Sequence, residues 1–402
     1  MTWKEIMLGQ IAEFRNGLNY TKENEGTGLL MINVKDFGDR FVPDYSSLGE
    51  ISAVGVNDDS FLQNGDILFV RSNGNRDLVG RSLLVEDPPA NLSFSAFCIR
   101  ARLSIEVEAK FYAYFFRSSE FRKRLSLLGS GTNISNLNQK VLSQISVPIP
   151  ERSIQRQIIE VLSPYDYLIE NNKRRIALLE ESVRLLYKEW FVDLRFPGHE
   201  HVKIIDGVPI GWRRVFVPEI IEINPAERVE KGKEIRYVPM SSLSETGMTI
   251  NLREVENRDK PTSGKFRNGD TLFARITPCL ENGKTAYVNF LQQEEVACGS
   301  TEFIVLRGIR VSSYFVYCLA RTYDFREHAI KSMIGSSGRQ RVQISCFNEF
   351  QLVLPPNPLL EQFNEVARNC FESLANLQRQ NDILIEARDL LLPRLMKGEI
   401  QL

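Results

Sequence analysis

Polar loops in each half of this 402-residue chain carry side chains that could bind nucleic acid. Arginine and lysine pair with phosphates and with guanine, while asparagine and threonine form hydrogen bonds with base edges. For any single residue, a solvated turn is the alternative. The candidates are Arg71, Asn73, Asn75, Thr132 and Asn133 in the first half of the chain, and Arg275, Thr277, Lys284, Arg339 and Arg341 in the second.

Two short motifs resemble enzyme signatures without completing them. Residues 87–90 (DPPA) resemble the DPPY signature of amino-methyltransferases, but Ala90 replaces the aromatic residue that stacks on the flipped base. Residues 283–285 (GKT) resemble the end of a P-loop, but Pro278 stands where its first glycine belongs, and a strand-like segment follows instead of a helix. We find no other catalytic signature, so the sequence predicts no catalytic residues.

The composition predicts a soluble, cytoplasmic protein without a metal or other cofactor. The six cysteines show no CxxC spacing, as in proteins that keep their thiols reduced. His199 and His201 could bind a metal, but no third ligand lies near them in the sequence. We see neither a signal peptide nor a run of about 18 apolar residues, and we therefore expect no membrane contact.

The charge is close to neutral in the whole chain and in its parts. The formal net charge is −1, and residues 1–150 hold 16 basic and 17 acidic residues. Residues 197–356 hold 21 basic and 19 acidic residues. DNA binding would therefore need charge that is arranged on particular faces or supplied by a partner.

The longest pattern in the chain is a heptad seam over residues 158–190. Apolar residues recur there at alternating steps of four and three, and Asn172 is the one polar member. Such a seam predicts a long helix that packs against another helix. At ~1.5 Å per residue the helix would be roughly 48 Å long. Pro164 predicts a kink or a local break near its start.

A second seam runs from Phe363 to Leu395, and each member lies 205 positions after its counterpart in the first. Asn357 as N-cap and Pro358 as first helical residue suit the start of this helix. The constant offset indicates an internal duplication rather than two unrelated core helices.

The blocks that precede the two seams repeat as well. Residues 64–69 (NGDILF) match residues 268–273 (NGDTLF), and a helix expected at residues 109–128 matches one at residues 312–333. Short strands surround these segments, which predicts a mixed α/β (α+β) globule in each block. The scaffold segments repeat, whereas the loops between them differ.

The layout of the whole chain resembles the specificity subunits of Type I restriction-modification enzymes. The resemblance is strongest at residues 150–157 (PERSIQRQ), 186–193 (LYKEWFVD) and 391–398 (LLPRLMKG). It implies a non-catalytic subunit whose two target recognition domains each read one half of a split double-stranded DNA site, with two central helices between them. It also implies partners: two modification subunits that carry the adenine methyltransferase, and restriction subunits that carry the motor and nuclease.

We therefore expect four parts in the chain. They are target recognition domain 1 (residues 1–150), a first spacer helix (151–196), target recognition domain 2 (197–356) and a second spacer helix (357–402). Half-sites one DNA turn apart have centres ~34–36 Å apart, and a spacer of roughly 48 Å can hold two globules at that distance.

A pseudo-two-fold relation between the copies predicts that the helices form an antiparallel coiled coil. The register of the seams pairs Trp190 with Phe363 near one end and Asn172 with Asn381 in the middle. A buried asparagine pair satisfies its hydrogen bonds in one alignment and penalises slipped ones. Alternatively, each asparagine faces solvent or a helix of a modification subunit.

The sequence leaves two other classes of function open. A self-contained methyltransferase with a decayed motif at Asp87 would bind S-adenosylmethionine by itself. A coiled-coil scaffold that only joins proteins would show no sequence-dependent DNA binding, even with its partners present.

Overall fold

The computed structural model describes residues 3–20, 26–38, 40–128, 136–229, 232–262, 264–336 and 338–402. The chain divides into two compact units. Unit 1 consists of Met1–Glu170 and Asn381–Leu402, and unit 2 consists of Asn171–Gln380. Each unit therefore contains one α/β globule and a segment of each long helix. None of the described helices is long and apolar enough to cross a membrane.

Unit 1 is built on three small sheets. A four-stranded antiparallel sheet has the order β2-β8-β5-β6, and a three-stranded sheet has the order β4-β3-β7 with β3 and β7 parallel. Strands β1 and β9 form a separate antiparallel pair. The strands are β1 (Glu5–Met7), β2 (Ala12–Asn16), β3 (Gly28–Ile32), β4 (Gly49–Ser52), β5 (Ile67–Val70), β6 (Ser82–Leu84), β7 (Leu92–Phe94), β8 (Cys98–Leu103) and β9 (Ser146–Pro148).

Unit 2 repeats this topology. Its sheets have the orders β13-β20-β17-β18 and β15-β14-β19-β16, with β14 and β19 parallel, and β12 pairs with β21. The predicted duplication is thereby confirmed, although β16 has no counterpart among the described strands of unit 1. The strands are β12 (Arg213–Phe216), β13 (Ile221–Ile223), β14 (Ile235–Val238), β15 (Glu256–Arg258), β16 (Lys265–Phe266), β17 (Thr271–Ala274), β18 (Thr285–Tyr287), β19 (Ala297–Gly299), β20 (Phe303–Gly308) and β21 (Gln351–Leu354), and a small hairpin, β10 (Ile204–Ile205) and β11 (Val208–Pro209), precedes them.

The repeated sequence NGD forms the turn before the central strand of each four-stranded sheet. In unit 2, Gly269 has a positive φ of 90°, a conformation that glycine adopts without steric strain. The Asp270 carboxylate accepts the Arg267 amide at 2.8 Å and the Arg307 guanidinium at 2.6 and 2.7 Å. Asp66 and Arg102 form the equivalent buried pair in unit 1. The motif therefore fixes the start of a strand whose other end leads into a candidate loop.

Each helical segment predicted in the blocks is two helices instead of one. In unit 1, α1 (Ala109–Arg117) and α2 (Ser119–Leu128) are separated by Ser118, which is extended (ψ 155°). Its hydroxyl accepts the Phe121 amide at 3.2 Å, so the serine caps the second helix. Thr322 separates α6 (Ser313–Arg321) from α7 (Tyr323–Lys331) in the same way. The helical periodicity continues across both breaks, which hid them in the sequence.

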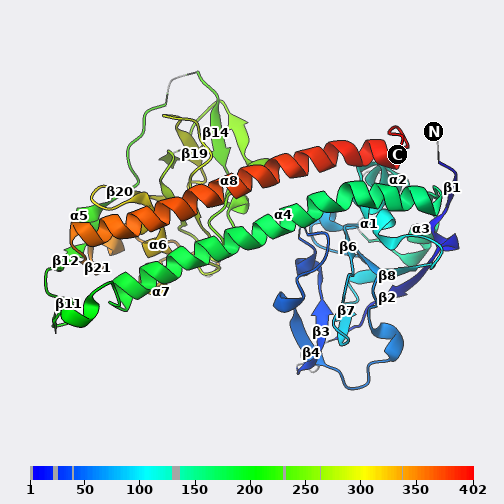
Figure 1. Ribbon diagram of the computed structural model, residues 1–402, viewed down its shortest axis with the longest axis horizontal. Helices are drawn as coiled ribbons and strands as arrows, with labels where there is room; N and C mark the ends of the chain where they lie inside the picture. Colours follow the sequence, from blue (N-terminus) through cyan, green and yellow to red (C-terminus); the bar gives the residue numbers. More distant parts are fainter. Residues whose placement is uncertain are drawn as a thin grey trace. The chain divides into compact units, whose positions relative to one another are not determined.

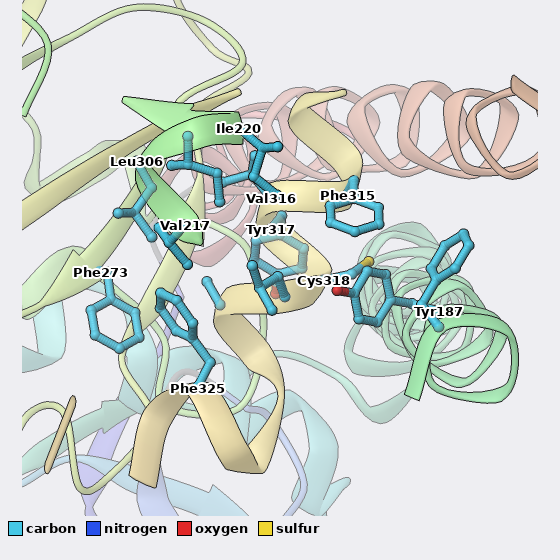
Figure 2. Close-up of a cluster of buried hydrophobic side chains, with 14 of the residues drawn as sticks. Tyr187, Val217, Ile220, Phe273, Leu306, Phe315, Val316, Tyr317, Cys318 and Phe325 are labelled. Atoms are coloured by element: carbon cyan, nitrogen blue, oxygen red, sulfur yellow. The ribbon is translucent and has the colours of Figure 1, made fainter. Parts of the chain in front are cut away.

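These helices bury the main hydrophobic core of each unit. In unit 2, Figure 2 shows aromatic side chains of α6 and α7 between the sheet and the long helix α4. The rings of Tyr187 and Phe315 lie 4.9 Å apart, and those of Phe273 and Phe325 lie 5.6 Å apart. All four side chains are buried. The long helix is thus part of the core of the globule.

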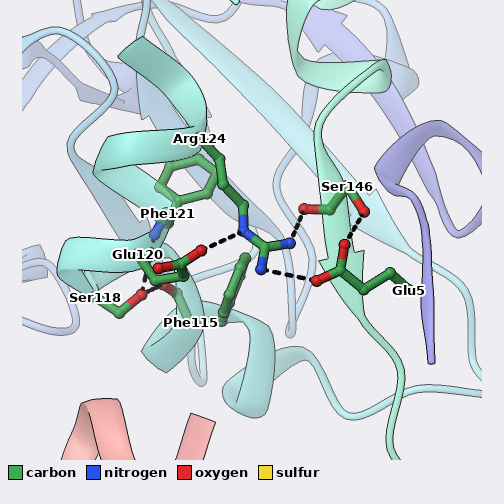
Figure 3. A network of polar contacts seen from close by, with 7 residues as sticks. All are labelled: Glu5, Phe115, Ser118, Glu120, Phe121, Arg124 and Ser146. Carbon is green, nitrogen blue, oxygen red and sulfur yellow. Dashed lines mark hydrogen bonds and ion pairs between the residues drawn. The ribbon is translucent and has the colours of Figure 1, made fainter. Parts of the chain in front are cut away.

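In unit 1, a polar network ties the first strand to α2 (Figure 3). Arg124 donates to the Ser146 carbonyl at 2.9 Å and forms ion pairs with Glu5 at 2.8 Å and Glu120 at 3.0 Å. Ser146 lies on β9, which pairs with β1. The hydrogen bond from Ser146 and the charge of Arg124 lower the pKa of Glu5.

The two long helices are α4 (Arg152–Tyr187) and α8 (Asn357–Met396), and α4 ends in a π-helical turn, Lys188–Val192 (Figure 1). The helix continues through Pro164, so the local break considered there is absent. Leu162 and Ile169 on either side are buried, and this packing holds the helix where one backbone hydrogen bond is lost. Helix α8 begins at Asn357 itself, and the carbonyl of Pro356 accepts the first helical amides.

The helices are antiparallel, as predicted. In unit 1, Ile158 from the start of α4 shares a core with Leu395 from the end of α8. In unit 2, the rings of Trp190 and Phe363, from the opposite ends of the helices, lie 6.4 Å apart. Every member of both seams is buried or half-buried, as a contact seam requires.

Candidate nucleic-acid interface

In unit 1, three loop segments meet at the end of strand β5. The Arg71 amide donates to the Phe97 carbonyl at 2.7 Å, and the Arg71 carbonyl accepts the Leu137 amide at 2.8 Å. Arg71 follows β5, Phe97 precedes β8, and Leu137 follows the polar loop at residues 129–136. The backbone therefore gathers the candidate loops in one place.

Unit 2 makes the same two hydrogen bonds at the end of strand β17. The Arg275 amide donates to the Glu302 carbonyl at 2.8 Å, and the Arg275 carbonyl accepts the Val342 amide at 2.9 Å. Arg275 is thus the structural equivalent of Arg71. Glu302 and Val342 stand 205 positions after their counterparts in unit 1, which is the offset of the two seams.

Arg341 and Glu302 form an ion pair in this region of unit 2. Arg341 donates from Nε to both carboxylate oxygens of Glu302 at 2.9 and 3.0 Å, and from Nη2 to one of them at 2.7 Å. The side chains are 44% and 22% exposed. The hydrogen bond and the charge of Glu302 raise the pKa of Arg341. Nearby, Arg275 donates from Nε to the Val342 carbonyl at 3.2 Å.

The loop that carries Arg341 is a narrow hairpin. Ile334 and Arg341 exchange two backbone hydrogen bonds of 3.0 and 3.1 Å. Arg339 lies near the tip of this hairpin and is exposed. In the described part of the chain, its guanidinium has no hydrogen bond or ion pair. Its positive charge is therefore available to an outside ligand.

Thr277 and Lys284 have their polar groups engaged inside unit 2. Thr277 is 8% exposed, and its hydroxyl accepts the Gln340 amide at 3.0 Å. The Lys284 ammonium donates to the Met240 carbonyl at 3.1 Å. The structure thus gives both residues a part in holding the loops. A hydroxyl or an ammonium can find a backbone carbonyl or amide that is distant in sequence, which the sequence alone does not reveal.

The first-half candidates form a compact turn after Arg71. Asn73 Oδ1 accepts the Asn75 amide at 2.8 Å, and Asn75 Oδ1 accepts the Asp77 amide at 3.0 Å. These Asx turns use the side-chain oxygens and leave both side-chain NH2 groups as donors. The remaining candidates, Thr132 and Asn133, lie outside the described residues.

Comparison with known proteins finds similarity to one family. Residues 1–181 match the family model described as the Type I restriction modification DNA specificity domain. The MjaIX specificity subunit of Methanocaldococcus jannaschii is 25% identical over 305 residues, covering 73% of this chain and 70% of that protein. The HindI specificity subunit of Haemophilus influenzae is 22% identical over 474 aligned positions, covering 99% of each. The chain is thus similar to Type I restriction specificity subunits, and its residues 1–181 match their DNA specificity domain.

A solved structure supports the same fold. The S subunit of a Type I restriction-modification system from M. genitalium superposes with a TM-score of 0.54 at 16% identity. The match covers 98% of this chain and 96% of that chain. At this identity the likeness concerns the fold alone.

Three further loop residues of this chain are missing from the candidates predicted from the sequence. Glu302 holds Arg341, as described above. At the equivalent positions of unit 1 stand Phe97, which is 60% exposed, and Asn136, which is exposed. The offset of 205 positions, applied to Arg341 and Glu302, would have found both.

The sequence predicts two pairs of contacting residues between the long helices. Trp190 and Phe363 are in ring contact within unit 2, as described above. Asn172 and Asn381 are each 6% exposed, but they belong to different units. The pairing of these two asparagines therefore stays a prediction.

In the described part of the chain, no cluster of three or more histidine, cysteine, aspartate or glutamate side chains could hold a metal ion. His199 Nδ1 lies 2.8 Å from the Phe196 carbonyl oxygen, a local contact within the connector after α4.

Proposed function

We propose that this chain is the DNA sequence-specificity subunit of a Type I restriction-modification complex. It is a recognition subunit without catalysis of its own. Each globule, residues 1–150 and residues 197–356, acts as a target recognition domain for one half of a bipartite double-stranded site. The helical segments, residues 151–196 and 357–402, act as spacers between them.

The proposal rests most directly on one observation. The backbone arrangement at the loops is the same in both units, but the side chains on the loops differ. Identical backbone hydrogen bonds fix Arg71 and Arg275, yet the neighbouring loop positions hold Phe97 in one unit and Glu302 in the other. A duplicated scaffold with different loops is suited to the recognition of two different half-sites.

We assign DNA contact to the side chains at these loops that keep free hydrogen-bond donors. They are Arg71, Asn73 and Asn75 in unit 1 and Arg275, Arg339 and Arg341 in unit 2, together with Thr132 and Asn133 from the loop outside the described residues. Thr277 and Lys284 then hold the loops in position.

The partners follow from the family and from the charge. A chain with a formal net charge of −1 can neutralise few phosphates, so most of the non-specific affinity has to come from other subunits. We propose two modification subunits as these partners, with restriction subunits joining the complex in the cytoplasm.

Methylome sequencing of host cells with and without this gene tests the proposal. We expect a bipartite methylated motif that disappears when the gene is deleted. A methylome that does not depend on the gene would contradict the proposal and favour a scaffold. If the isolated chain bound S-adenosylmethionine in calorimetry, the non-catalytic role would be wrong.

A further inference from the structure

The ion pair between Arg341 and Glu302 leaves one edge of the guanidinium open. The carboxylate occupies Nε and Nη2, which form one side of the planar group. No hydrogen bond or ion pair to a described residue involves Nη1. The edge formed by Nη1 and the second hydrogen of Nη2 therefore remains available, and this edge can donate two parallel hydrogen bonds.

The ion pair and the hydrogen-bonded backbone on both sides of it fix the direction of that open edge. The backbone of Arg341 is bonded to Ile334 on one side, and its neighbour Val342 is bonded to Arg275. The Glu302 carbonyl accepts the Arg275 amide, and its own amide donates to the Ser300 hydroxyl at 3.2 Å. Both members of the pair thus rest on bonded backbone, as precise recognition requires.

The pair is poorly suited to binding a phosphate. Its two charges cancel, and a phosphate at the open edge would also meet the negative charge of Glu302. Arg339, two residues earlier in the same hairpin, has an uncompensated charge and suits a phosphate better. A base edge carries no net charge, so Glu302 does not oppose contact with it.

The ion pair is also unnecessary for the backbone arrangement of these loops. Unit 1 makes the same two backbone hydrogen bonds with Phe97 in place of Glu302 and Asn136 in place of Arg341. Neither residue can form the ion pair. The pair therefore belongs to the variable part of unit 2, where differences between half-sites are expected.

We propose that Arg341 reads a guanine in the half-site of unit 2 through its open edge, and that Glu302 is the residue that positions it. Guanine presents O6 and N7 as two neighbouring acceptors in the major groove, and this pattern matches two parallel donors. The inference rests on the proposed function, because it names the base class that one of the two recognition domains takes.

The test compares four forms of the full-length gene in the host: wild type, Arg341→Ala, Glu302→Gln and Arg339→Ala. The first measurement is the methylated motif. We expect Arg341→Ala to lose discrimination at one G·C position of one half-site, by roughly 10- to 100-fold. Glu302→Gln should relax the same position to a smaller extent. Arg339→Ala, the matched control from the same hairpin, should relax no position.

The second measurement is the salt dependence of binding by the complex purified with its modification subunits, on a duplex that carries the motif. Glu302→Gln removes a charge that masks Arg341, so the slope of log K against log salt should become steeper by about one unit. A loss of loop structure alone would not steepen this slope.

Several results would overturn the inference. They are an unchanged motif with Arg341→Ala, relaxation at an A·T position, and effects of Arg341 and Glu302 at different positions. Loss of the whole motif at an unchanged melting temperature would also count against it. If Arg341→Ala fails to fold, both measurements on Glu302→Gln test the inference instead. The amide oxygen of this glutamine can still accept a hydrogen bond from Arg341. If the wild-type gene produces no motif, the proposed function itself fails.

Discussion

Arg339 and Arg341 lie two residues apart, yet their surroundings assign them different roles. Arg341 is held by a carboxylate, whereas Arg339 has no side-chain partner among the described residues. An unpaired guanidinium at an exposed hairpin tip suits a phosphate, which it can reach from several directions.

We therefore predict that Arg339→Ala weakens binding of the complex to all DNA sequences by a similar factor. The slope of log K against log salt should become shallower by about one unit, since one phosphate contact is lost. Fluorescence anisotropy over a series of salt concentrations measures both effects. Arg195→Ala, which removes an exposed arginine paired with Glu189, is the control. An unchanged affinity would show that Arg339 does not contact DNA.

Glu108 connects the beginnings of two helices in unit 1. It precedes α1, and its Oε1 accepts Arg152 Nε and Arg156 Nε of α4, both at 2.8 Å. The hydrogen bond from Arg156, helped by that from Arg152, lowers the pKa of Glu108 below its ordinary value of 4.5. The unfolded chain thus binds more protons between the two pKa values, so stability rises with pH in that window.

We predict that Glu108→Gln lowers the melting temperature at pH 7, by the equivalent of about 1 kcal/mol or less, because the arginines are partly exposed. The difference from wild type should shrink as the pH falls below about 4.5, where the wild-type carboxyl also loses its charge. Melting curves between pH 3 and pH 7 measure this. A difference that stays constant over the range would contradict the assigned role of the carboxylate.

At the scale of elements, the long helices are part of both cores, and in the proposed function they also set the spacing between the half-sites. Tyr187 of α4 and Phe363 of α8 belong to the hydrophobic core of unit 2. A change in helix length between the globules leaves such core contacts in place, whereas a change within them does not.

We predict that inserting one heptad into each helix, in α4 between Glu170 and Asn171 and in α8 between Gln380 and Asn381, where the two units divide, lengthens the spacer between the two half-sites of the DNA motif. Seven residues add about 10 Å, or roughly three base pairs. Both half-site sequences should stay as they are, because no loop changes. Methylome sequencing measures both the length of the spacer between the half-sites and the sequences of the half-sites. A new half-site sequence with an unchanged spacer length would contradict the spacer model, and insertion into one helix alone should destabilise the chain.

The predicted Asn172–Asn381 pair can be tested by a double-mutant cycle. Each single change to leucine should lower the free energy of unfolding by about 1 to 3 kcal/mol, because it leaves a buried amide without its partner. The double change should recover most of that loss, which gives a coupling energy well above 0.5 kcal/mol. Denaturant unfolding of the four proteins measures it. Additive effects would mean that the two side chains do not meet.

At the scale of the whole molecule, the distribution of charge decides how the chain can act. Unlike proteins that bind DNA through a strongly basic surface, this chain has balanced charge in both blocks. Several of its arginines are committed to carboxylates inside the globules, such as Arg102 with Asp66 and Arg307 with Asp270.

We predict that the isolated chain binds DNA weakly in moderate salt and that the complex with modification subunits binds tightly and with sequence preference. The reason is that few phosphates can be neutralised by this chain alone. Anisotropy titrations of one duplex with either form measure the difference. Tight, sequence-specific binding by the isolated chain would contradict the prediction.

The sequence by itself determined the repeated architecture of this protein. The seams from Ile158 and from Phe363 predicted two long antiparallel helices, and the offset of 205 positions predicted two copies of one frame. Both inferences need only the pattern of neighbouring residues or a comparison of the chain with itself. Helical periodicity follows from 3.6 residues per turn, and a duplication is visible when a chain is compared with itself.

The tertiary structure alone decided which polar side chains are free and which are used inside the fold. Glu302 and Arg341 are 39 residues apart in sequence, and Lys284 donates to a carbonyl 44 residues away. Thr277 lies in a loop, as predicted, but its side chain is buried. Such pairings depend on how loops fold back over strands, and burial favours whichever donor and acceptor meet there. The sequence records the donors and acceptors, but only the packed chain determines the partner of each.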